Sequence, residues 1–354
     1  MSQTTRRSFL QAVPVAGAAG RAPAASPTRI DCQSHLFSEE FLRRLEKRQD
    51  SPRVERVGGE RYLIVGPWRR RILAKHTDVK AKLADMDRAG IRLAVLSIND
   101  PGPELFGRDS VTVARELNDF IAEVVSRHPD RFLGLAVLPF DSPEAMLKEL
   151  ERATSRPGMK GILLYSNLNG RFPDEEPFRP LFQEAERRGL PLLLHPACPV
   201  TYEATQGYEM AAGLGLMFDT TIALCRIILA GLLEKHPRLK LVCPHTGGAL
   251  PYLIGRVDHQ VMILKRGGQH IRQAPSYYLK QVWFDTVNPL GLGIRYVWQF
   301  AGPHKLLYAS DHPWVDPRLI VEQIESQRFP EADLERIWWR NAKELFGLKP
   351  EASQ

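Results

Sequence analysis

Histidine, glutamine and aspartate side chains, which can bind a metal ion, occur at or just after the ends of several short apolar runs. Gln33 and His35 lie two residues apart, His195 ends one apolar run, and Asp311 ends another. On an extended chain, residues two apart point to one side, so Gln33 and His35 can share a site. Imidazole nitrogens with a carboxylate form the ligand set of a catalytic divalent ion. We therefore predict one divalent metal ion, with zinc expected, and Gln33, His35, His195 and Asp311 as its ligands.

A third histidine, His245, follows a further apolar run and begins a turn that contains Gly247 and Gly248. Glycines let the chain leave a strand abruptly, which aims the ring over the metal without coordinating it. An imidazole beside a metal site can take up or return a proton during catalysis. We predict that His245 is the catalytic acid–base residue.

These residues lie at or just beyond the ends of four of eight short apolar runs, each of which leads toward an amphipathic, helix-like stretch. Several runs are continuous and aliphatic, which is typical of parallel strands covered on both faces. Glycine and proline end most of the helical stretches between them, among them the stretch Ala211–Lys235. The runs are Arg29–Cys32, Ile91–Ile98, Phe132–Leu138, Lys160–Tyr165, Leu190–His195, Lys240–His245, Val282–Asp285 and Lys305–Asp311.

Eightfold strand–helix alternation predicts an α/β fold, a closed (β/α)₈ TIM barrel, whose active site is built from the carboxyl ends of the strands. A doubly wound open sheet is the rival fold, but the glycine-rich phosphate turn expected after its first strand is not present. Residues 36–76 are too long for a simple strand–helix connection. We expect them to form a cap insertion after the first strand, with strands of its own around Arg61–Val65.

The amino terminus resembles a twin-arginine export signal. Arg6 and Arg7 precede a short, weakly apolar run that ends in small residues. We therefore expect residues 1–26 to be a signal peptide and residues 27–350 to form the barrel. This predicts a periplasmic protein; without a working signal the protein stays in the cytoplasm.

Composition narrows the class of protein further. The chain has 354 residues, 44% hydrophobic and 25% charged, as in an ordinary globular protein. No run approaches the roughly 20 apolar residues that span a bilayer, so we expect no membrane span. The formal charge of +7 falls to +4 without the three arginines of the signal segment, and we expect no nucleic-acid partner. Four cysteines without a CxxC pair exclude a disulfide scaffold and a zinc knuckle.

The segments that carry these residues resemble the amidohydrolase superfamily, in particular the branch typified by aminocarboxymuconate-semialdehyde decarboxylase. The resemblance runs in order from about residue 29 to 347. It implies that His35, His195 and Asp311 are metal ligands and that His245 is a base or proton relay. The matching segments are Ile30–His35, Leu193–Pro196, Pro244–Gly248 and Ser310–Trp314.

The resemblance also implies how a substrate is held. Arg256, eleven residues beyond His245, corresponds to an arginine that in the family enters a neighbouring subunit's site and binds the substrate carboxylate. A homodimer is therefore expected. Arg70 in the cap, with Arg69 as the open alternative, is a second candidate for binding a carboxylate. Trp314 is a further candidate for contact with the substrate.

Two positions depart from the family pattern. Gln33 stands where the family usually has the first histidine of a His-x-His pair, and an amide oxygen is a weaker ligand than imidazole. Tyr165 ends the fourth run, where two-metal members of the superfamily carry a carbamylated lysine. The second departure favours a single metal ion.

Three functions remain open from the sequence. The first is a metal-dependent decarboxylase of an aromatic or unsaturated carboxylic acid, which Arg256 and the cap favour because they suit a small carboxylated substrate. The second is a metal-dependent hydrolase of an amide, lactone or C–C bond. The third is a binding protein on the same barrel with little or no metal, which Gln33 suggests.

Overall fold

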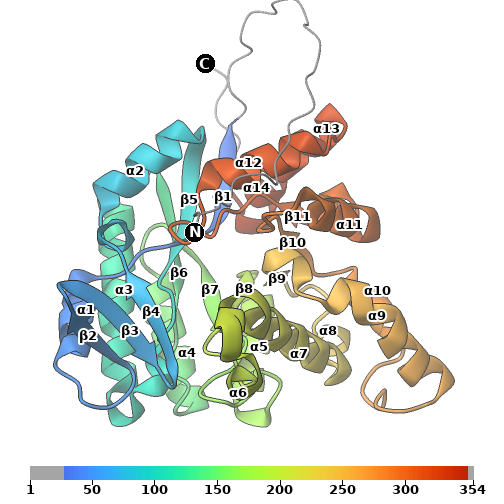
Figure 1. Cartoon of the computed structure of the whole chain (residues 1–354). Helices are drawn as coiled ribbons and strands as arrows, with labels where there is room; N and C mark the ends of the chain where they lie inside the picture. Colours follow the sequence, from blue (N-terminus) through green and yellow to red (C-terminus); the bar gives the residue numbers. More distant parts are fainter. Residues whose placement is uncertain (1–27, 350–354) are drawn as a thin grey trace, which may run out of the picture.

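Eight parallel strands form a barrel at the centre of the computed structural model, which describes residues 28–349 (Figure 1). The strands follow one another around the barrel in chain order, as the sequence predicts. All neighbouring pairs are parallel. The strands are β1 (Arg29–His35), β5 (Ile91–Ser97), β6 (Phe132–Ala136), β7 (Met159–Tyr165), β8 (Leu192–His195), β9 (Leu241–Cys243), β10 (Trp283–Asp285) and β11 (Leu306–Leu307).

The barrel closes between β1 and the chain that follows β11. β11 is shorter than the expected run to residue 311, because the chain beyond it makes only single bonds to β1. The Cys32 amide donates to the Tyr308 carbonyl at 2.9 Å, and the Asp311 amide donates to the Gln33 carbonyl at 3.0 Å. The His35 amide donates to the carbonyl of residue 312 at 2.7 Å. We call this contact, between residues 32–35 and 308–312, the seam.

The interior of the barrel is packed rather than open. Leu135, Leu163 and Leu193 lie on successive strands and share the interior with Cys32 and Val242. They leave a hollow of only about 10 Å³, room for about one water molecule. The barrel therefore offers no channel, and small molecules must be bound at its mouth.

Helices surround the barrel and are capped where the sequence supplies a short polar side chain. Asp78 accepts from the amides of Lys80 and Ala81 at the start of α2, and Ser142 caps α4 in the same way. The helices are α2 (Val79–Arg88), α3 (Ser110–Arg127), α4 (Pro143–Thr154), α5 (Arg179–Arg188), α6 (Tyr202–Thr205), α7 (Leu216–Leu229), α8 (Leu232–Lys235), α9 (Leu250–Asp258), α10 (Pro275–Leu279), α11 (Gly291–Ala301), α12 (Pro317–Ser326), α13 (Glu331–Glu335) and α14 (Asn341–Phe346).

The expected helical stretch Ala211–Lys235 is not one helix. A π-helical turn at its start precedes α7, and Gly231 then breaks the helix with φ of 73°. A Cβ at Gly231 would lie 2.3 Å from the His270 carbonyl oxygen, so only glycine fits this close approach. Ala211–Leu229 is the one part of the described chain long and apolar enough to cross a membrane, but a core helix passes the same test.

The segment expected to form the cap lies between β1 and α2 and has secondary structure of its own. It consists of α1 (Glu39–Glu46) and a three-stranded antiparallel sheet of β2 (Arg53–Val57), β3 (Glu60–Val65) and β4 (Trp68–Ile72), drawn in blue in Figure 1. β3 is the strand expected around Arg61–Val65. Both terminal nitrogens of Arg61 bond the Glu39 carboxylate at 2.8 and 2.9 Å, which ties this sheet to α1. The expected signal peptide lies outside the described residues.

Candidate active site

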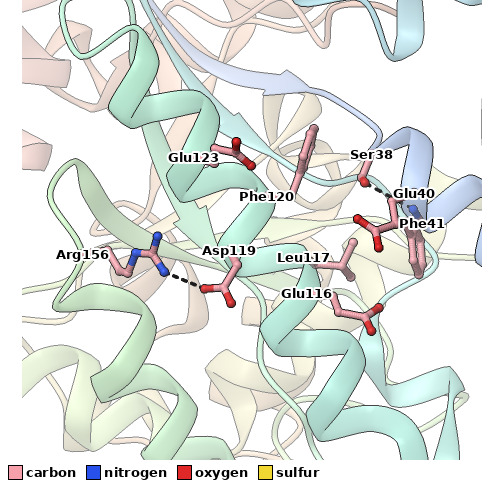
Figure 2. Close-up of a pocket in the computed structure, with 9 residues that line it drawn as sticks. All are labelled: Ser38, Glu40, Phe41, Glu116, Leu117, Asp119, Phe120, Glu123 and Arg156. Atoms are coloured by element: carbon pink, nitrogen blue, oxygen red, sulfur yellow. Dashed lines mark hydrogen bonds and ion pairs between the residues drawn. The ribbon is translucent and has the colours of Figure 1, made fainter.

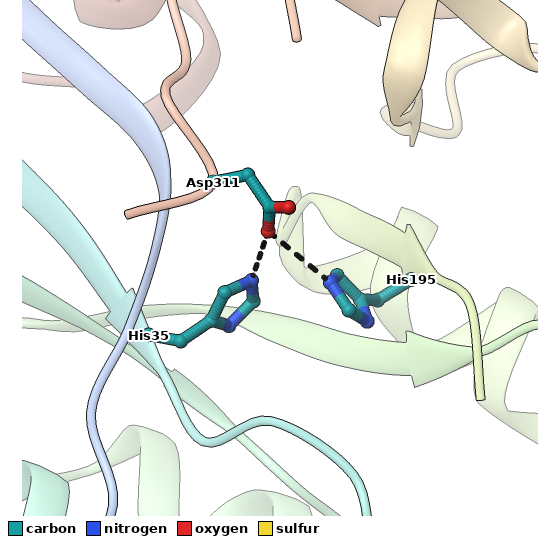
Figure 3. A group of neighbouring side chains, drawn as sticks. All are labelled: His35, His195 and Asp311. Atoms are coloured by element: carbon teal, nitrogen blue, oxygen red, sulfur yellow. Dashed lines mark hydrogen bonds and ion pairs between the residues drawn. The ribbon is translucent and has the colours of Figure 1, made fainter. Parts of the chain in front are cut away.

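Three of the predicted ligands meet at the mouth of the barrel (Figure 3). His35 ends β1, His195 ends β8, and Asp311 lies in the seam after β11. Oδ1 of Asp311 is 3.0 Å from Nε2 of His35 and 3.9 Å from Nε2 of His195. One ligand atom from each of the three lies within 4.8 Å of the others. Three segments this distant in sequence would not place such donors together without the barrel.

Hydrogen bonds to the far side of each ring orient the two imidazoles. Nδ1 of His195 donates to the Pro196 carbonyl at 2.8 Å, so Nε2 carries the free lone pair. That buried Nε2 has no hydrogen-bond partner within residues 28–349. Nδ1 of His35 lies 2.9 Å from Oγ of Ser97, a residue at the end of β5 that sequence reasoning missed. Such outer partners fix the ring orientation of metal-binding histidines.

Gln33 lies beside Asp311, but it contacts the carboxylate. Its amide nitrogen donates to Oδ1 of Asp311 at 3.1 Å. In this orientation the amide nitrogen helps to hold the aspartate in place. The structure thus brings Gln33 to the predicted cluster, and its role as a metal ligand stays a prediction.

The charges in the cluster favour an ionised carboxylate at Asp311 beside an unprotonated imidazole at His35. Burial would raise the pKa of Asp311, but interactions with His195, His245 and His35 outweigh burial and hold that pKa well below its usual range. Burial, together with repulsion from His195, lowers the pKa of His35 to about 4. Near neutral pH the cluster therefore offers one anion and an unprotonated imidazole at His35, the forms that bind cations.

His245 lies near the second carboxylate oxygen of Asp311. Its Nε2 is 3.8 Å from Oδ2 of Asp311, and its Nδ1 is buried without a hydrogen-bond partner in the described part of the chain. His245 and Thr246 have φ of 53° and 54°, which is unusual for residues other than glycine. Although burial opposes it, the pKa of His245 is raised by Asp311 and by Asp285. A proton is therefore held more firmly here than on an ordinary histidine.

Asp285, at the end of β10, holds this turn and was not among the predicted site residues. Its Oδ1 accepts from the amides of His245 at 2.7 Å and Val287 at 3.0 Å. Burial raises the pKa of Asp285 to about 6. The signal was present in the sequence, because Asp285 is a carboxylate at the carboxyl end of a predicted strand.

A cavity of about 800 Å³ opens over the cluster and reaches His195, His245 and Asp311. The predicted substrate residues Arg70 and Trp314 line it as well. Much of its remaining wall is apolar, which suits a flat hydrocarbon ring more than a sugar or a phosphate. The apolar lining comes from the cap and from three loops at the mouth, through Trp68, Pro196, Ala212, Leu216, Met217, Val287, Pro289 and Val315.

Arg69, Arg70 and Arg71 of the cap differ in the side chains that they contact. Nη1 and Nη2 of Arg70 bond the Asp100 carboxylate at 2.6 and 2.7 Å, so its charge is already neutralised. Arg71 pairs with Glu60 at 2.6 Å. Arg69 stacks on the ring of Tyr62 at 3.6 Å and makes no ion pair within the described residues. All three arginines line the cavity.

Arg256 is exposed on α9 and does not line the cavity of its own chain. The structure therefore separates it from the residues it was predicted to assist. Its exposure leaves it free to contact another molecule.

A second hollow, of about 490 Å³, lies on the outside of the barrel between α1 and α3 (Figure 2). Glu40, Glu116, Asp119 and Glu123 make it acidic, and Arg156 pairs with Asp119 at 2.7 Å. No histidine and none of the predicted site residues line this hollow. Of the two hollows, the one at the barrel mouth is therefore the candidate active site.

Fold and site together define a (β/α)₈-barrel protein with an imidazole–carboxylate cluster at its mouth. The family model for amidohydrolases matches residues 30–348, and the chain belongs to that family. It is 30% identical over 298 residues to 2-amino-3-carboxymuconate-6-semialdehyde decarboxylase of Dictyostelium discoideum, covering 82% of each chain. It is 29% identical over 294 residues to gamma-resorcylate decarboxylase of a Rhizobium species, covering 77% of this chain and 87% of that one.

Solved structures agree with this assignment. 5-Carboxyvanillate decarboxylase from Sphingomonas paucimobilis superposes with a TM-score of 0.80 at 25% identity, over 92% of this chain and all of that one. The 5-carboxyvanillate decarboxylase of Novosphingobium aromaticivorans, complexed with manganese and a nitrobenzoic acid, gives a TM-score of 0.77 at 25% identity. That match covers 91% of this chain and 97% of the other. The predicted fold and superfamily are confirmed.

Proposed function

We propose that the protein is a metal-dependent decarboxylase of an aromatic or unsaturated carboxylic acid. The observation that carries the proposal is the convergence of His35, His195 and Asp311 at the foot of a largely apolar cavity. The relatives described above are named decarboxylases, which supports this function over the predicted alternative of a hydrolase. The donor set argues against the third alternative, a binding protein with little metal.

The residues present fit a divalent ion. Nε2 of His195 is buried toward the Asp311 carboxylate with no hydrogen-bond partner among residues 28–349, an arrangement that costs free energy unless a ligand is bound there. His35, His195 and Asp311 would hold the ion, and Gln33 would orient Asp311. A bound divalent ion supplies Lewis acidity toward substrate oxygen atoms. Zinc is the element expected from the ligands, and manganese, present in the related 5-carboxyvanillate decarboxylase, is the alternative.

His245 would supply the proton that the reaction consumes. Loss of carbon dioxide leaves an electron pair on the substrate carbon, and a proton must take the place of the carboxyl group. His245 faces the cavity and holds its proton more firmly than an ordinary histidine. Asp285 keeps the ring in place by bonding the amide of His245. Solvent would then reprotonate the ring.

A cation at the cavity wall would hold the substrate's carboxylate. Arg70, the first candidate from the sequence, is bound to Asp100, whereas Arg69 lines the same cavity without an ion pair in the described chain. We therefore assign the cap's anion contact to Arg69 and a supporting role to Arg70. Trp314, which lies 5.7 Å from the Arg70 guanidinium, would pack against the substrate ring.

The protein, freed of metal and reloaded with Zn²⁺ or Mn²⁺, should release carbon dioxide from at least one member of a panel of hydroxybenzoates and unsaturated acids. His245→Ala should lower kcat by about 10²–10⁴-fold with metal content unchanged, because the change removes proton transfer and no ligand. Arg69→Ala should raise KM about tenfold or more, since a charge-assisted hydrogen bond is lost. Carbon dioxide release and elemental analysis are the measurements.

His195→Ala serves as the matched control, because it removes a ligand and should lose both metal and activity. Hydrolysis of amides or lactones without any carbon dioxide from the acids would show the alternative, a hydrolase. Full activity in the metal-free protein would refute the metal-dependent mechanism.

We also propose that the protein is a homodimer in which Arg256 of each chain enters the other chain's cavity. Arg256 is exposed on α9, and apolar side chains near it are exposed as well. Tyr252 on α9 is 79% exposed and Ile263, in the turn that follows, is 68% exposed. Exposed apolar surface of this kind is typical of protein–protein interfaces.

Mixing Arg256→Ala protein with His245→Ala protein should restore part of the lost activity. A hybrid dimer contains one site with both an intact His245 and an intact Arg256, whereas neither parent dimer does. Turnover after subunit exchange, followed alongside the molecular mass in solution, measures this. If the mixed variants exchange subunits and recover no activity, the shared site is wrong.

We further propose export through the twin-arginine signal in residues 1–26. Replacing Arg6 and Arg7 with lysine in a reporter fusion should keep the fusion in the cytoplasm, because the pair is the recognised feature. The wild-type signal fused to the same reporter is the control. Periplasmic delivery of the lysine variant at the wild-type level would show that the arginine pair is incidental.

A further inference from the structure

Lys82, on α2, is a wholly buried lysine that the proposed mechanism does not use. Its Nζ donates to Oγ of Ser34 at 2.6 Å, to Nδ1 of His312 at 2.7 Å and to the carbonyl of His312 at 3.4 Å. No carboxylate among the described residues forms an ion pair with it. Burying an amine costs free energy even when it is hydrogen-bonded, so an apolar side chain would serve stability better.

His312 is held on both ring nitrogens. Nδ1 accepts from Lys82, and the proton on Nε2 is donated to Oδ2 of Asp85 at 2.8 Å. Lys82 and Asp85 are three residues apart and so lie on one face of α2. The ammonium form of Lys82 can donate all three hydrogen bonds, and the amine form can still donate to Oγ of Ser34 and Nδ1 of His312. We call Lys82, Asp85 and His312 the clamp.

The clamp contacts the seam next to the proposed ligands. The carbonyl of His312 accepts from the amide of His35 at 2.7 Å, and His312 directly follows Asp311. Asp311 has φ of 59°, a conformation that residues other than glycine keep only where the surroundings enforce it. A rotation of the His312 backbone would therefore move both Asp311 and His35.

We propose that Lys82 and Asp85 are positioning residues, which fix His312 and through its backbone set the distance between His35 and Asp311 that a divalent ion requires. The inference rests on the proposed metal site and is independent of the reaction performed there. Residues that support metal ligands in this way typically contribute about 10–100-fold to metal affinity.

Binding of Mn²⁺ alone to the full-length, metal-free protein tests the inference, with free Mn²⁺ followed by electron paramagnetic resonance and no substrate present. Lys82→Met keeps the length of the side chain and removes all of its N–H donors, so Kd should rise about 10–100-fold. Asp85→Ala should weaken binding in the same direction. Asp85→Asn should bind close to wild type, because its amide oxygen still accepts from His312.

Leu150→Ala is the matched control, since Leu150 is fully buried on α4, which lies outside the seam. It should lower the denaturation midpoint and leave the Mn²⁺ Kd unchanged, which separates positioning from general stability. If Lys82→Met does not fold, the pair Asp85→Ala and Asp85→Asn decides. Wild-type affinity in Asp85→Ala, or in a folded Lys82→Met, would overturn the clamp. A wild-type protein that binds no Mn²⁺ or Zn²⁺ would instead refute the metal site.

Discussion

Closure of the barrel at the seam is the constraint on which the site depends. β1 and the chain after β11 are separated by more than 270 residues, yet the amides of Asp311 and His35 bond across the gap at 3.0 and 2.7 Å. These bonds bring a carboxylate from the end of the sheet beside an imidazole from its beginning. His195 completes the cluster because β8 ends at the same mouth of the barrel. Without closure, His35 and Asp311 would lie at opposite edges of an open sheet, with His195 between them on β8.

The cluster gains its character from burial as much as from residue type. In water the histidines and the carboxylate would titrate near their ordinary values. In the barrel, burial and mutual repulsion lower the pKa of His35 to about 4, while the rings around Asp311 keep that residue ionised. The pKa of His245 shifts in the opposite direction, upward against the effect of burial, because the ring is near two carboxylates, Asp311 and Asp285. The two imidazoles thus differ in proton affinity, which suits the roles proposed for them, cation binding at His35 and proton transfer at His245.

The backbone at these residues is held in an unusual conformation. His245, Thr246 and Asp311 all have positive φ, and each lies where a hydrogen bond from another element fixes the chain. Asp285 bonds the amide of His245, and the seam holds Asp311. Strained residues of this kind gather where function fixes side-chain direction at the expense of local preference.

The sequence predicts the eight strands, the cap and the residues that converge, because strand periodicity and the strand-end rule are local signals. The ends of strands are less predictable: β11 has two residues, since pairing across the seam depends on β1. The partner of Arg70 could not be predicted, because Asp100 is 30 residues away and meets it only once the cap folds over the mouth. Lys82 was likewise hidden, as nothing in its amphipathic surroundings distinguishes a buried lysine from an exposed one. Asp285 ends a predicted strand, so the strand-end rule could have identified it.

The position of a bound ion tests the central claim most directly. Crystals of the protein loaded with Mn²⁺ can be measured near the manganese absorption edge, where anomalous scattering locates the ion without reference to the rest of the density. We expect one strong peak at the barrel mouth, about 2.0–2.3 Å from Nε2 of His35, Nε2 of His195 and a carboxylate oxygen of Asp311. No peak there at saturating Mn²⁺, or a peak bound by other residues, would contradict the assignment of these three side chains as the metal site.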